Sequence, residues 1–517
     1  MKVRKVEGMV LYISIGVILI FVLWGAIAPE KLASTATSLF DFSIANFGWF
    51  FLISTFSFLV CAFYLAFSKY GRIKLGQDDD EPEYSTASWF AMLFSAGMGI
   101  GLVFWGVAEP LSHYLTPPEG AAGASTEAAR LAMRYSFFHW GIHPWAIYTM
   151  ISLTLAYFQF RKGKKGLISA VFSPILGKVS EGWVGGAIDT LAIIATAFGV
   201  ATSLGLGALQ INGGLNHMFG ITIHSTVQVI IIAVVTVLFL LSATTGLDKG
   251  IRILSNTNLI IAVLLMTFVL VVGPTSFILD LFTSTLGGYL QNLIYMSLRM
   301  TPFTQGTWVG VWTLFYWAWW IAWGPFVGTF IARVSKGRTI KEFVLGVLLV
   351  PSLFSFIWFS VFGGTGLHLE LFDHYPIAAA ADKDVTSALF LTLEQLPVGH
   401  VIAFIATLLI LTFFVTSADS ATFVLGMLST KGNPNPSNRV KIVWGILQSA
   451  IAIVLLMSGG LSGLQTASIV AAVPFAVIII GMCVSLIVSL REDEKKLRSK
   501  EQKRLRKIDE LLRENEA

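Results

Sequence analysis

The chain has 517 residues, of which 55% are hydrophobic and only 13% are charged, and its mean hydropathy is strongly positive. Soluble domains are roughly half apolar and a quarter charged, so this composition excludes an ordinary soluble protein and indicates an all-α polytopic membrane protein. The net charge of +5 does not indicate a nucleic-acid partner, because the basic residues form short clusters between apolar segments. Two cysteines, both inside apolar segments, exclude a disulfide framework.

Apolar segments long enough to cross a bilayer as helices recur along the whole chain, and we predict about twelve of them. Basic clusters fall in alternate loops, which predicts that both termini are cytoplasmic. The predicted spans are Val10–Ala28, Trp49–Phe67, Trp89–Val107, Phe137–Phe158, Ala187–Leu206, Ser225–Leu241, Leu259–Phe282, Trp308–Ile331, Phe343–Gly363, Val401–Leu425, Val440–Met457 and Thr466–Leu490.

The order of these spans predicts five regions. They are an N-terminal two-helix region (1–88), a first five-helix repeat (89–285), a short amphipathic helix on the outer face (286–300), a second five-helix repeat (301–490) and a charged cytoplasmic tail (491–517). The eighth span comes five spans after the third, an odd number, so the second repeat is expected to run inverted relative to the first.

Glycines are expected to interrupt two spans. The third span contains Gly97, Gly99 and Gly101 at alternate positions, and the eighth contains Gly324-Pro325 followed by Gly328. Glycine lets backbone approach a ligand, and the freed carbonyls and amides must then line a cavity. The alternative is close helix packing through small residues.

Aromatic residues are unusually dense in the eighth span, where rings continue from Trp312 to Trp323, beyond the extent of an interfacial belt. Trp140, Trp145 and Tyr148 stand at near-helical spacing in the fourth span. One such stripe is typical of core packing, but two facing stripes beside a broken helix favour a box for a cation that has no proton to donate. We expect no acidic side chain near these rings, which suits a zwitterion whose own carboxylate meets backbone amides of the broken third span.

Four motifs carry a specific resemblance that extends over nearly the whole chain. They are Gly97 to Gly101, Gly106 to Pro110, Phe138 to Trp145, and the Trp-Thr pair that starts at Trp312. The sequence resembles the betaine/choline/carnitine transporter family, most closely its bacterial glycine betaine carriers. The resemblance implies two N-terminal helices before a five-plus-five inverted-repeat, LeuT-like core, and often a homotrimer.

The resemblance also implies a substrate site. Its members in this sequence are Trp140, Trp145, Tyr148, Trp319, Trp320, Trp323, Gly97, Met98, Gly99 and Gly101. Trp323 is expected to line the cytoplasmic path. Choline carriers of the family have Asp at the position of Gly101, which favours betaine over choline here.

Sodium is the coupling ion that the resemblance implies, and it needs oxygen ligands. One site would be formed by Ser95, Met98, Phe413, Thr416 and Ser417, and a second by Thr196 and Phe326. Val200 departs from the hydroxyl residue that some members have near the second site. The alternative for any of these hydroxyls is a bond back to its own helix.

The expected function is sodium-coupled uptake of glycine betaine, or a related quaternary-ammonium solute, for osmoprotection across a bacterial cytoplasmic membrane. A sodium-independent exchanger of carnitine or choline compounds is the alternative. No enzyme activity is expected, because no cluster of His, Cys and acidic residues has ligand spacing. No cofactor is expected besides sodium; the partners are a small zwitterion, sodium and membrane lipid. Glu109-Pro110 is interpreted as an outer gate or a helix stop.

Overall fold

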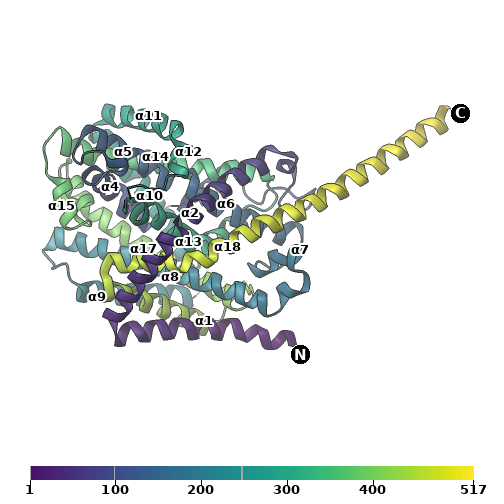
Figure 1. Cartoon of the computed structure of the whole chain (residues 1–517), viewed down its shortest axis with the longest axis horizontal. Coiled ribbons are helices and arrows are strands. Elements are labelled where there is room, and N and C mark those ends of the chain that lie inside the picture. The colour runs from purple at the N-terminus through teal and green to yellow at the C-terminus, as the bar shows by residue number, and fades with distance from the viewer. Residues whose placement is uncertain (1, 98, 246–247, 305, 517) are drawn as a thin grey trace.

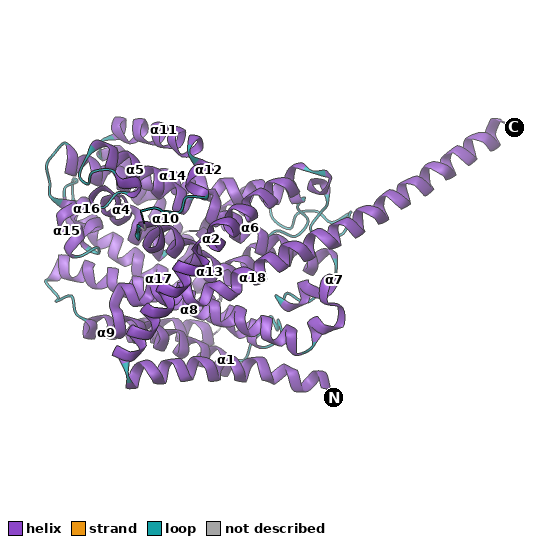
Figure 2. Ribbon diagram, in the orientation of Figure 1, coloured by secondary structure: helices purple, strands orange, loops and turns teal. Residues whose placement is uncertain are grey.

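The computed structural model describes residues 2–97, 99–245, 248–304 and 306–516. This part of the chain folds into helices and loops without a named strand (Figure 2). One isolated bridge pairs Lys74 with Thr339. The sequence prediction of an all-helical protein is confirmed.

The longer helices are α1 (Lys2–Ile27), α2 (Pro29–Phe67), α3 (Thr86–Gly97), α4 (Ile100–Leu115), α5 (Thr126–Trp140), α6 (Ile142–Ala156), α8 (Trp183–Phe219), α9 (Ser225–Thr245), α10 (Asp248–Val272), α11 (Thr275–Gln291), α13 (Phe315–Arg333), α14 (Ile340–Leu371), α17 (Gly399–Ser429) and α18 (Asn438–Glu516). Short helices are α7 (Ser173–Leu176), α12 (Leu293–Ser297), α15 (Ile377–Lys383) and α16 (Ser387–Glu394). Within the described residues, 8 helices are long and apolar enough to cross a membrane: α1, α2, α8, α9, α10, α14, α17 and α18.

The predicted interruption of the third span is confirmed. Helix α3 ends at Gly97 and α4 starts at Ile100, and between them Gly99 is fully extended with φ −160° and ψ −176°. Met98 lies outside the described residues. A Cβ atom added at Gly99 would meet no atom within 4 Å, so the backbone of the break borders open space.

A second break lies in the predicted fourth span, where none was expected. Helix α5 ends at Trp140, Gly141 leaves helical geometry with ψ −141°, and α6 starts at Ile142. A Cβ atom at Gly141 would lie 2.5 Å from the carbonyl oxygen of Phe137 and 2.8 Å from the ring of Phe356. Only glycine fits this position without a rearrangement of its neighbours.

The predicted interruption at Gly324-Pro325 was wrong, because α13 runs through both residues to Arg333. The glycines of this helix serve close packing. Cβ atoms added at Gly324 and Gly328 would lie 2.3 and 2.6 Å from side-chain atoms of Ile151 in α6. For Gly324 and Gly328 the alternative, small residues at a helix contact, is therefore correct. The irregular part of the predicted eighth span is a π-helical turn at Gly310–Leu314.

The range 286–300, predicted as one amphipathic helix, does not form a single helix. Helix α10 ends at Val272, and Pro274, which cannot donate a backbone hydrogen bond, precedes α11 at Thr275. Residues 286–300 are therefore split among the end of α11, α12 and a loop. Helix α11 lies along one edge of the bundle, at the top of Figure 1.

The final helix, α18, contains a sharp turn and then leaves the bundle. Gly460 has φ 55° and ψ −135°, a conformation that favours glycine. The last part of α18 extends away from the other helices (Figure 1). Near the point of exit, the Asp493 carboxylate accepts hydrogen bonds from Tyr157 Oη at 2.7 Å, from Arg161 Nε at 3.1 Å and from Lys162 Nζ.

Candidate substrate-binding cavity

A cavity of about 820 Å³ lies among α4, α6, α13 and α17, and it extends to α10. The residues around the break of the third span and the aromatic residues of α13 meet there. The predicted site residues that line it are Gly99, Gly101, Trp140, Tyr148, Trp319, Trp320, Trp323, Phe326, Phe413, Thr416 and Ser417. Residues from segments far apart in the sequence thus line one cavity.

Trp320 is the centre of the aromatic box. Its ring centroid lies 5.3 Å from that of Trp140 and 5.2 Å from that of Tyr148, with interplanar angles of 82° and 66°. Trp319 stands 6.2 Å from Trp140 and 6.3 Å from Trp320. These nearly perpendicular rings offer several faces to a ligand, and ring faces carry the negative end of the aromatic quadrupole.

Trp145 takes a different place from the one implied by the resemblance. It does not line the cavity but packs behind it, with its ring centroid 5.6 Å from Tyr148 and 6.3 Å from Trp320. It therefore supports the box. Trp323 donates its indole Nε1–H to the carbonyl oxygen of Gly199 at 2.7 Å, which fixes α13 against α8.

Gly101 is the point where the backbone approaches the box. A Cβ atom at this residue would lie 2.4 Å from Trp319 Cη2 and 3.2 Å from Trp140 Cη2. Even an alanine methyl group would press on both rings, and a longer acidic side chain would need still more room.

The residues implied for sodium are brought together only in part. Phe413, Thr416 and Ser417 line the cavity, and Thr416 Oγ1 donates to the carbonyl oxygens of Thr412 and Phe413 at 3.0 and 3.3 Å. The side chain of Ser95 and all of Met98 lie outside the described residues.

The second sodium pair lies on α8 and α13. Thr196 is buried and donates to its own helix at Ala192 O, 2.8 Å away, which is the alternative that the sequence left open. Phe326 lines the cavity, whereas Thr196 does not.

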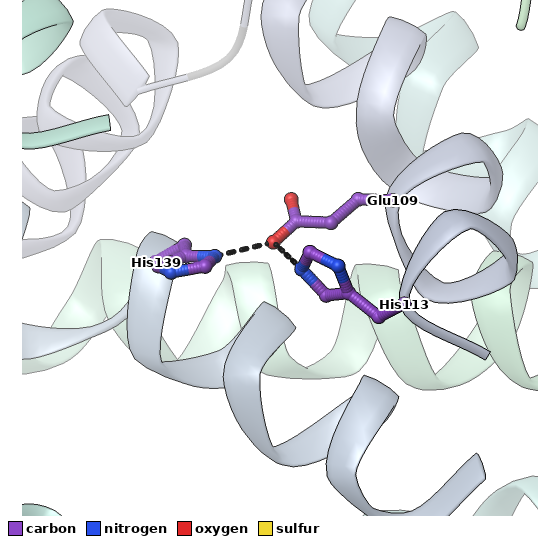
Figure 3. A group of neighbouring side chains, drawn as sticks. All are labelled: Glu109, His113 and His139. Carbon is purple, nitrogen blue, oxygen red and sulfur yellow. Dashed lines mark hydrogen bonds and ion pairs between the residues drawn. The ribbon is translucent and has the colours of Figure 1, made fainter. Parts of the chain in front are cut away.

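A buried carboxylate stands behind the box, where the sequence predicted none. Glu109 is completely buried. Its Oε1 atom lies 3.1 Å from His113 Nε2 and 2.7 Å from His139 Nδ1, and the two imidazoles approach this oxygen from α4 and α5 (Figure 3). Its Oε2 atom accepts from Trp140 Nε1 at 2.8 Å and from the Tyr316 hydroxyl. The sequence prediction failed because the third span was ended at Val107, whereas α4 continues through Pro110 to Leu115.

The same cluster corrects the expectation that His and acidic residues do not gather. Glu109, His113 and His139 offer ligand atoms within 4.8 Å of one another. Residues 109 and 113 share a face of α4 by their spacing, but His139 comes from α5, so spacing alone could not reveal the group.

Polar residues of α10 were also missed. Asn258 lines the cavity and is buried, and both polar atoms of its amide have no hydrogen-bond partner among the described residues. Asp419, in α17, lines the same cavity. In the sequence, Asn258 lies just before an apolar run, and nothing in its neighbours distinguishes it from a helix-end residue.

Interrupted helices around an internal cavity, in a chain with many apolar spans, are the architecture of a membrane transporter. The chain matches the family described as BCCT, betaine/carnitine/choline family transporter, over residues 9–495. It belongs to this family.

Three relatives illustrate the similarity. A glycine betaine transporter, OpuD, of Bacillus subtilis is 51% identical over 494 residues, which are 95% of this chain and 96% of the relative. An ectoine/hydroxyectoine transporter of Virgibacillus pantothenticus is 48% identical over 497 residues, 96% and 99% of the two chains. A glycine betaine transporter of Acinetobacter baylyi is 42% identical over 487 residues, 94% and 74% of the two chains.

Proposed function

We propose that this protein carries a small zwitterion with a quaternary-ammonium group, glycine betaine first, into the cell for osmoprotection. The cavity walled by Trp140, Tyr148 and Trp320 is the observation that carries the proposal. A trimethylammonium group has no N–H to donate, and a ring face attracts it by up to about 2 kcal/mol where water is excluded. The names of the relatives in Bacillus subtilis and Acinetobacter baylyi support the same substrate.

Ectoine is the second candidate substrate. It is supported by the relative from Virgibacillus pantothenticus, which covers 96% of this chain. Ectoine is also a zwitterion, but its cationic ring carries N–H groups. Rings alone would leave those donors unpaired, at a cost of about 1–3 kcal/mol each, so competition between the two solutes distinguishes the candidates.

Coupling to sodium is part of the proposal. Thr416 and Ser417 bring hydroxyl groups to the cavity wall beside Phe413, and hydroxyl and carbonyl oxygens are suitable ligands for a hard cation. A tenfold sodium gradient, about 1.4 kcal/mol, and 100 mV, about 2.3 kcal/mol per charge, allow one ion to sustain roughly a few-hundredfold accumulation of a neutral zwitterion.

We further propose about twelve spans in a two-plus-five-plus-five arrangement within a bacterial cytoplasmic membrane, with both termini cytoplasmic. Five helical units, α3/α4, α5/α6, α8, α9 and α10, precede α11 in the described chain. Five follow α12: α13, α14, α17 and the parts of α18 on either side of Gly460. This equal division supports an inverted-repeat core. We also propose that the protein contacts membrane lipid and forms a homotrimer.

Uptake of labelled glycine betaine into proteoliposomes tests the function. We expect accumulation under an inward sodium gradient and none when potassium replaces sodium. Accumulation that persists without sodium, or that occurs only as exchange from preloaded vesicles, would contradict the coupling. An absence of both uptake and binding would contradict the substrate.

A further inference from the structure

Glu109 has four contacts, two to each carboxylate oxygen. Trp140 Nε1 and the Tyr316 hydroxyl donate to one carboxylate oxygen, and the two imidazoles approach the other at hydrogen-bonding distance. A carboxylate whose two oxygens both act only as acceptors is ionised. The network is therefore satisfied by an ionised Glu109 that accepts all four contacts.

The second nitrogen of His139 also has a partner. His139 Nε2 lies 3.0 Å from Thr313 Oγ1, and a hydroxyl can donate to it when Nδ1 carries the ring proton. No lysine or arginine of the described chain forms an ion pair with Glu109. The carboxylate is thus held inside the bundle without a lysine or arginine partner, and each of its four neighbours matters for keeping it there.

One of these donors belongs to the box itself. The indole of Trp140 lines the cavity, and its nitrogen donates to Glu109 at 2.8 Å. A hydrogen bond to a carboxylate polarises its donor, and the effect is large where the dielectric constant is low. In an indole, the shift moves electron density from the N–H into the ring and makes its face more negative, which strengthens its attraction for a cation.

We propose that Glu109 is a specificity-determining residue that acts through Trp140 and makes the box selective for a positively charged group. The carboxylate does not line the cavity, so it positions and polarises the ring without touching the substrate. This inference rests on the proposed function. It adds that Glu109 makes the box prefer a cationic group to an uncharged group of the same shape. The four hydrogen bonds also occupy the carboxylate, so a metal ion would have to displace them.

The test compares glycine betaine with 3,3-dimethylbutanoate, in which carbon replaces the charged nitrogen. Kd values are measured for the purified full-length protein in sodium buffer, directly for betaine and by competition for the analogue, whose tert-butyl group is uncharged while its carboxylate is retained. We expect Glu109→Gln to raise the Kd for betaine at least about tenfold, equivalent to about 1.4 kcal/mol, and to change the Kd for the analogue less than about twofold. Glu119→Gln is the matched control: Glu119 is exposed, accepts one hydrogen bond from Tyr135 at 2.7 Å and should change neither value.

Trp140→Phe provides a test that keeps the carboxylate in place. It retains a ring but removes the N–H through which Glu109 acts, so the preference for the ligand with the trimethylammonium group should fall by a similar factor. Adding Glu109→Gln to this variant should lower the preference no further. An equal loss of affinity for both ligands, or additive effects of the two substitutions, would overturn the inference while leaving the proposed function intact. A wild-type protein that does not bind betaine would overturn the proposed function itself.

Discussion

Replacing Gly101 by alanine should weaken betaine binding without unfolding the protein. The new Cβ atom would lie 2.4 Å from Trp319 Cη2, well inside the roughly 3.5–4.0 Å at which carbon atoms attract. The Trp319 ring stacks on Phe315, with centroids 5.7 Å apart and an interplanar angle of 12°. Because this stacking restricts the movement of the ring, we expect it to shift within the cavity that it lines.

Overpacking of this kind costs typically about 1–3 kcal/mol. If the displaced ring narrows the cavity, the overpacking energy opposes betaine binding. A middle value of ~2 kcal/mol then raises the KM for betaine about thirtyfold. The assay is the initial rate of labelled betaine uptake into proteoliposomes at saturating sodium, over a range of betaine concentrations. Gly16→Ala in α1 is the matched control, because a Cβ atom there would meet nothing within 4 Å; its KM should equal that of the wild type.

Repeating the substitution in a Trp319→Phe variant tests whether the clash with Trp319 Cη2 raises the KM. Phenylalanine at position 319 lacks the Cη2 atom, so Gly101→Ala should raise KM less than about threefold when it is added to Trp319→Phe. The same fold increase in both backgrounds would show that the clash with Trp319 is not the cause. No increase in the wild-type background would refute the packing argument.

Four further outcomes are expected. Trp320→Ala removes the ring 5.2 Å from Tyr148 and should raise the KM for betaine about thirtyfold, from the loss of ~2 kcal/mol of cation–π attraction; an unchanged KM would exclude a role for this ring. Ser417→Ala should raise the sodium concentration for half-maximal uptake and leave the rate at saturating sodium nearly unchanged, whereas an unchanged sodium curve would remove Ser417 from the ion site. Asn258→Leu should lower uptake but raise the melting temperature without substrate, because the amide that it removes is buried without a partner among the described residues; a lower melting temperature would contradict this. Asp493→Asn weakens contacts to two basic side chains and should lower the melting temperature by a few degrees, with no shift expected if the cluster is fully solvated.

The features predicted correctly from sequence depend on neighbours along the chain. Alternate glycines from Gly97 to Gly101 predicted the break in the third span, and ring density predicted the aromatic wall at Trp319 and Trp320. Local backbone freedom and local hydropathy are properties that a short segment carries by itself.

The features that the sequence missed depend on packing between distant segments. Gly141 breaks the fourth span under the ring of Phe356 in α14, and a single glycine in an apolar segment gives no sign of such a contact. Pro325 remains within a continuous helix, with the neighbouring glycines packed against Ile151. The carboxylate of Glu109 finds donors on α5 and α13, which no spacing rule could have brought together.

The break at Gly141 divides the aromatic box between two helices, α5 and α6. Trp140 is the last residue of α5, whereas Tyr148 belongs to α6, so no helical repeat fixes the distance between these two walls. The backbone N–H of Ile142, exposed by the break, reaches the Tyr289 hydroxyl of α11 at 3.4 Å. A change in the angle between α5 and α6 would change the separation of Trp140 and Tyr148 while both helices keep their own hydrogen bonds, and the contact with Tyr289 links that angle to the position of α11.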